Sequence, residues 1–144
     1  MGVFYVEPEK VAEGYGIEVV ADETLGEDIY GYGRVDDNGK GKIGYNPKMP
    51  ERKIRFTVAH VLGHFLLGHF AEEKEFMEKH DNFDSEAPVL EDEANMFALE
   101  LLIPKDKVEF LIYGKGITSP KEIANILKVS EVALVHMLKK YSIL

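Results

Sequence analysis

Residues 55–64 read RFTVAHVLGH, and they contain two histidines, His60 and His64, in an otherwise apolar run. On an α-helix, residues four apart lie on the same face, one turn from each other. Two imidazole nitrogens in this arrangement can bind one zinc ion, each about 2 Å from the metal. The stretch therefore predicts a helix that carries half of a metal site.

The usual motif of this kind is H-E-x-x-H, whose Glu acts as general base in hydrolysis. Here Val61 occupies the second position, so the two candidate ligands are present and the base is missing. Gly63 costs roughly 1 kcal/mol inside a helix, which is tolerable where another backbone approaches closely. The pair alone also fits two core histidines that are held by hydrogen bonds.

The composition is that of an ordinary soluble domain. The chain has 144 residues, of which 45% are apolar and 30% charged, and it has no Cys. A metal must therefore be bound by His, Asp or Glu. We expect a cytoplasmic protein that does not enter a membrane, because no apolar run is long enough for a signal peptide or a membrane span.

The net charge of −9 is unevenly distributed. Residues 105–144 carry seven Lys and four acidic residues, which leaves a net charge of −12 on residues 1–104. This acidic balance disfavours direct binding to nucleic acid. Residues 72–93 contain ten acidic residues and two Lys. They fit either a solvated connection or an acidic rim that attracts a basic partner or metal ions.

The first third of the chain predicts a small antiparallel sheet. A short helix is expected over residues 8–13. Strands are expected over 17–20, 29–35 and 42–45, with an Asn-Gly hairpin turn within 36–39.

The histidine helix should begin near Pro50 and end at Gly68. His69 follows nine residues after His60, whereas the motif with three histidine ligands requires ten. We therefore expect His69 to be a hydrogen-bonding residue near the helix end and not a ligand. Residues 72–84 predict at most one or two helical turns, with His80 on the surface.

A second strong helix is expected over residues 85–103, stopped by Pro104. Glu91 and Asn95 lie one turn apart on it, an offset that suits a carboxylate ligand and a side chain that braces a metal-bound His. The rival carboxylates are Glu86, Asp92 and Glu93.

The C-terminal residues predict two short helices. The first starts with the capping box Ser119-Pro120-Lys121-Glu122, and the second runs over residues 131–141. The pair resembles a helix-turn-helix in structure only, because it offers few cations for phosphate contacts.

These segments together resemble the ImmA/IrrE family of zinc metallopeptidases. Its members read R-F-T-x-A-H-E-L-G-H and then E-x-x-A-N-x-F-A-x-x-L-L-x-P, and this chain has RFTVAHVLGH and then EDEANMFALELLIP. The resemblance implies an α+β fold with a zincin-type helical core. We expect one domain over 1–144, with 1–46 mostly β, the metal-site helices in 50–104 and the closing helices in 105–144.

The resemblance also implies a gluzincin-like site. Zinc would be held by His60, His64 and Glu91, with Asn95 behind a ligand, and Val61 would stand where relatives have the catalytic Glu. Active relatives cleave a helix-turn-helix repressor. Two functions follow: a zinc peptidase acting on such a repressor with catalysis impaired by Val61, or an inactive protein that binds a regulator or other protein without cutting it.

Overall fold

The computed structural model describes residues 4–71, 75–79 and 88–144. The chain divides into two compact units, one formed by residues 7–98 and the other by residues 4–6 and 99–144. The single domain that was expected over 1–144 stays a prediction. The predicted α+β class is confirmed, because the chain combines a four-stranded sheet with helices.

The first unit is built on a mixed sheet with the strand order β1-β3-β2-β4. The strands are β1 (Glu18–Ala21), β2 (Ile29–Val35), β3 (Gly41–Tyr45) and β4 (Glu75–Lys79). The β2–β3 hairpin was predicted, and its turn is closed by Asp36, whose side chain accepts hydrogen bonds from the amides of Asn38 and Lys40.

The expected all-antiparallel sheet is wrong in one respect, since β1 pairs with β3 in parallel. The link between β1 and β2 is a loop and not a tight turn, so β1 can take the outer edge of β3 and run in its direction. Asn46, which is fully buried, holds that loop by donating to the carbonyls of Gly26 and Ile29.

The strand β4 is a second correction, because residues 75–79 were expected to be helical or irregular. They pair antiparallel with β2 at the sheet edge. Their side chains alternate as a strand requires: Phe76 and Glu78 are buried and Glu75 is exposed. The rest of that predicted segment, residues 72–74 and 80–84 with His80 among them, lies outside the described ranges.

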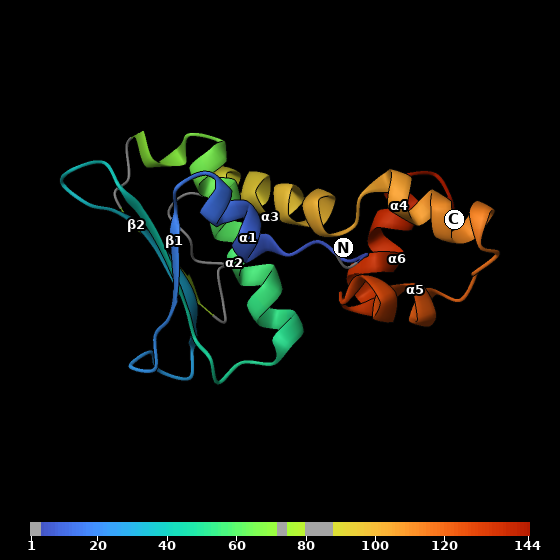
Figure 1. Cartoon of the computed structure of the whole chain (residues 1–144), viewed down its shortest axis with the longest axis horizontal. Helices are drawn as coiled ribbons and strands as arrows, with labels where there is room; N and C mark the ends of the chain where they lie inside the picture. The colour runs from blue at the N-terminus through green and yellow to red at the C-terminus, as the bar shows by residue number, and fades with distance from the viewer. Residues whose placement is uncertain (1–3, 72–74, 80–87) are drawn as a thin grey trace. The chain divides into compact units, whose positions relative to one another are not determined.

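The histidine helix is α2 (Glu51–Leu66), and Figure 1 shows it with α1 (Pro8–Gly14) on one side of the sheet. A glycine in β2 allows this close packing: a Cβ atom on Gly33 would lie 2.5 Å from Cγ1 of Val61. As predicted, α2 ends beside Gly68, whose φ of +79° suits glycine. A 3₁₀ turn, η1 (His69–Ala71), follows.

The second metal-site helix is α3 (Pro88–Leu102). It crosses α2 at Gly63, where an added Cβ would lie 3.1 Å from Cβ and Cδ1 of Phe97. Gly63 therefore leaves room for the side chain of Phe97, whereas the close approach of another backbone was predicted. The predicted start of this helix, at residues 85–87, lies outside the described part of the chain.

The second unit consists of short helices after Pro104. They are α4 (Lys105–Glu109), the π-helical turn η2 (Phe110–Gly114), α5 (Pro120–Leu127) and α6 (Glu131–Lys140). The last two were predicted, and Ser119 caps α5 by accepting from the amide of Glu122. The helices at 105–114 were not. Within the described ranges, no helix is both long and apolar enough to span a membrane.

Candidate metal centre

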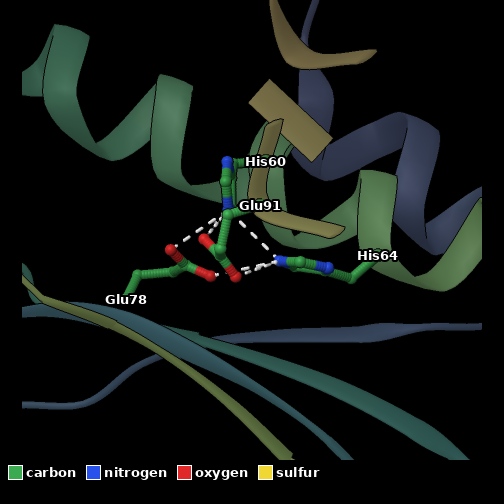
Figure 2. A group of neighbouring side chains, drawn as sticks. All are labelled: His60, His64, Glu78 and Glu91. Carbon is green, nitrogen blue, oxygen red and sulfur yellow. Dashed lines mark hydrogen bonds and ion pairs between the residues drawn. The ribbon is translucent and has the colours of Figure 1, made fainter. Parts of the chain in front are cut away.

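Four side chains from three elements of the first unit meet in one place. His60 and His64 come from α2, Glu78 from β4 and Glu91 from α3. Their potential donor atoms all lie within 4.8 Å of one another, and all four residues are buried. Figure 2 shows both carboxylates directed at the two imidazole rings. The structure thus brings together the three predicted ligands and adds a fourth residue, Glu78.

The distances between donors are short and similar. The Nε2 atom of His60 lies 2.9 Å from Glu91 Oε2 and 3.1 Å from Glu78 Oε2. The Nε2 atom of His64 lies 3.0 Å from Glu91 Oε1 and 3.4 Å from Glu78 Oε1. The two Nε2 atoms are 3.2 Å apart.

These values are close to the donor separations around one zinc ion, with a different oxygen of each carboxylate nearest to each imidazole. With donors about 2.0–2.1 Å from zinc, neighbouring donors of a tetrahedron are about 3.3 Å apart. Two imidazoles and two carboxylates are donors that zinc accepts, and the two negative charges balance a divalent cation in a buried place. The residues present therefore fit a zinc ion.

The shifted pKa values of the four side chains also favour a bound cation. Burial alone would lower the pKa of His60, but the carboxylates of Glu78 and Glu91 outweigh it and raise that pKa to about 9. The pKa of His64 is raised for the same reason. Burial would raise the pKa of Glu78 and of Glu91, yet both are lowered by the neighbouring imidazoles. The two carboxylates therefore create a place for positive charge, which protons or a metal ion can supply.

His69, which was not expected to be a ligand, contacts the far side of His64. Its Nδ1 atom lies 2.8 Å from Nδ1 of His64, and its Nε2 atom lies 3.1 Å from Oε1 of Glu93. When Nε2 of His64 faces a metal, its Nδ1 carries the proton and donates to His69, which in turn donates to Glu93. The rival carboxylate Glu93 thus lies behind the cluster and not in it.

The other candidates do not join the cluster. Asn95 is half-buried one turn after Glu91, Asp92 is exposed, and Glu86 lies outside the described ranges. Within the described ranges, no hydrogen bond joins Asn95 to an imidazole. Nδ1 of His60 likewise has no partner there. The bracing role of Asn95 stays a prediction.

Sequence reasoning missed Glu78, although a signal existed. In E-F-M-E, Phe76 and Glu78 are two residues apart, so a strand would place both on one face. The acidic composition of the segment hid this pattern.

Val61 follows the first ligand candidate and is fully buried. Its Cγ1 atom lies over Gly33 of β2, so this side chain fills the space between the helix and the sheet. An alkyl group cannot accept a proton.

An α+β fold in which one helix carries two histidines four apart and the next supplies a glutamate defines a metallopeptidase-type protein. The comparison with known families agrees, because the model of the peptidase family described as the IrrE N-terminal-like domain matches residues 12–139. The chain belongs to this family, the ImmA/IrrE zinc metallopeptidases. A comparison with curated proteins gives no match.

Proposed function

We propose that this protein binds one zinc ion through His60, His64 and Glu91 and acts on a helix-turn-helix transcriptional repressor, with hydrolysis impaired by Val61. The observation that carries the proposal is the buried cluster of two imidazoles and two carboxylates. Membership of a zinc peptidase family supports zinc as the metal.

A bound zinc ion would supply a Lewis acid that polarises a carbonyl and lowers the pKa of water. The chain's own residues must then provide the base, the proton donor and the substrate contacts. His60, His64 and Glu91 come from two crossing helices that are fixed by the contact between Gly63 and Phe97, so the metal site would be preorganised.

Impairment is proposed because Val61 stands at the position of the family's general base. Removing a general base alone costs about 10²–10⁴ in rate. The side chain of Val61 is buried between its own helix, α2, and the strand β2. It has no polar group that could orient a water molecule.

The second candidate function is binding of a regulator or other protein without cleavage. It is favoured by Val61 together with the second carboxylate, Glu78, in the donor cluster. The repressor as partner rests on the family resemblance. The net charge of −12 on residues 1–104 supports a protein partner over DNA.

The test is a titration with a purified helix-turn-helix repressor of the kind that the family resemblance implies. The zinc-loaded protein should bind it in isothermal calorimetry, and mass spectrometry of the mixture should show cleavage that is absent or very slow. His64→Ala serves as the matched metal-free variant. Absence of zinc from the wild-type protein, or absence of binding to the regulator, would overturn the respective half of the proposal.

A further inference from the structure

The two carboxylates of the cluster stand in equivalent positions, and this equivalence has consequences for access to the metal. Each carboxylate directs one oxygen at His60 and the other at His64, with distances of 2.9 and 3.0 Å for Glu91 and 3.1 and 3.4 Å for Glu78. We propose that Glu78 is the fourth protein donor, so that the site is a closed four-ligand centre with no position for water or a substrate carbonyl. The inference rests on the metal binding proposed above.

The distances separate a donor from a base. A carboxylate that serves as general base accepts a hydrogen bond from the attacking water and therefore stands one hydrogen bond outside the donor shell. The oxygens of Glu78 instead lie directly against the two Nε2 atoms, at 3.1 Å from His60 and 3.4 Å from His64, so the carboxylate can reach the same ion as the imidazoles. The second carboxylate is thus placed as a ligand and not as a relocated substitute for a Glu at position 61.

The charge of the cluster supports a fourth donor. With neutral imidazoles, Glu91 alone would leave a divalent ion with one uncompensated positive charge in a buried place. Glu78 completes the balance, and it is itself only 4% exposed. A buried carboxylate is costly unless it meets a cation.

The backbone holds Glu78 in this position. It lies on β4, which pairs with β2 so that Glu78 is opposite Gly31. Two residues earlier, the ring of Phe76 stacks on His64, with centroids 4.0 Å apart and planes 11° from parallel. The strand therefore presents its aromatic ring and its carboxylate to the same imidazole, which fixes the donor without a flexible loop.

A closed site has a different use from an open one. Structural zinc sites have four protein ligands, whereas catalytic ones keep a position open. In this protein the closed centre would join β4, α2 and α3. A general base would have no water to activate at such a site. A Glu at position 61 would then have no catalytic role, and an apolar residue can take its place.

The experiment uses cobalt(II) as a spectroscopic replacement for zinc in the full chain. Acetohydroxamate is the added ligand, and water-proton relaxation reports water bound directly to the cobalt. We expect the wild-type visible spectrum to be unchanged by acetohydroxamate and the relaxation to show no bound water. A spectral shift or bound water in the wild-type protein would overturn the proposal.

Two variants sharpen the result. Glu78→Ala should open one position, so that acetohydroxamate changes its spectrum. Glu78→Gln should weaken metal binding by more than ~100-fold, beyond the ~10–100-fold that is lost when an outer-shell partner is replaced. The matched control is Glu75→Ala on the same strand, whose side chain is about half exposed and pairs with Arg34. It should behave as wild type. Equal metal affinity and equal insensitivity to acetohydroxamate in all four proteins would also contradict the donor role.

Failure of this inference is distinguishable from failure of the proposed function. A wild-type chain that takes up no cobalt or zinc refutes the metal site as a whole. A chain that takes up metal and then binds acetohydroxamate keeps the metal site and refutes only its closure. The wild-type measurements decide between these outcomes even if circular dichroism shows that a Glu78 variant has not folded.

Discussion

Replacing Val61 with Glu restores the residue that the family motif carries, and it should make folding depend on the metal. Val61 is fully buried, and its Cγ1 atom occupies the space above Gly33, where even a Cβ atom would lie within 2.5 Å. The longer Glu side chain cannot extend in that direction. Without metal, the loss of apolar contacts and the burial of a carboxylate should lower the free energy of unfolding by about 3–5 kcal/mol.

Urea unfolding in the presence of chelator measures this loss. With a slope of about 2 kcal/mol per M for a chain of this size, the midpoint should fall by about 2 M. Added zinc should recover at least about 2 kcal/mol beyond its effect on wild type, because a carboxylate next to a cation is strongly stabilised. Val58→Glu is the matched control, since Val58 is also fully buried on α2. It should lose stability without this recovery.

Two results would refute the reasoning. If Val61→Glu loses less than about 1 kcal/mol in chelator, position 61 is not enclosed. If zinc stabilises the Val61 and Val58 variants equally, position 61 does not face the metal. Once folding and zinc content are established, Val61→Glu should raise cleavage of the cognate regulator by ~10²–10⁴ if the site is open. If Glu78 closes the site, the rate should rise only when Val61→Glu is combined with Glu78→Ala.

Three further predictions concern ligands and partners. Elemental analysis should find one zinc per chain, and His64→Ala should lose most of it; unchanged content would remove His64 from the site. Glu91→Gln should lose the metal while Glu93→Gln keeps it, and the opposite result would exchange the roles of the two residues. His69→Ala should weaken zinc binding by ~10–100-fold with the fold intact, and Asn95→Ala should do the same if Asn95 braces a ligand. The protein alone should not retard duplex DNA in a low-salt mobility shift, and specific retardation would contradict the inference from its negative charge.

The helices of the site could be predicted because their signals are local. Periodic apolar residues and flanking Pro and Gly located α2 and α3 within a few residues, and the i, i+4 rule put His60 and His64 on one face. The cost of Gly63 in a helix predicted the approach of another backbone, and the side chain of Phe97 occupies that place instead. For the same reason the β2–β3 hairpin could be predicted from its turn.

The missing parts depend on contacts between distant residues. The strand β4 pairs with β2 about 40 residues earlier in the chain, and nothing within Glu75–Lys79 encodes that pairing. The parallel pairing of β1 is non-local as well. Because Glu78 joins the site only through the pairing of β4, the fourth carboxylate could not be placed from the sequence. His69 was predicted to make hydrogen bonds, but its partner could not be named.

The position of its two carboxylates decides what this site can do. A Glu that followed the first histidine on α2 would act on water beside the metal, whereas Glu78 comes to the imidazoles from β4 of the sheet. The total of two acidic side chains around two imidazoles is then the same in both arrangements, and so is the charge that a divalent ion has to balance. The two arrangements differ in the fourth coordination position of the metal. A carboxylate on the helix leaves this position to water, whereas a carboxylate on the paired strand can occupy it. Exchanging the helix carboxylate for a strand carboxylate would therefore preserve metal binding and its contribution to stability while removing hydrolysis, and the Val61 and Glu78 variants separate these two properties.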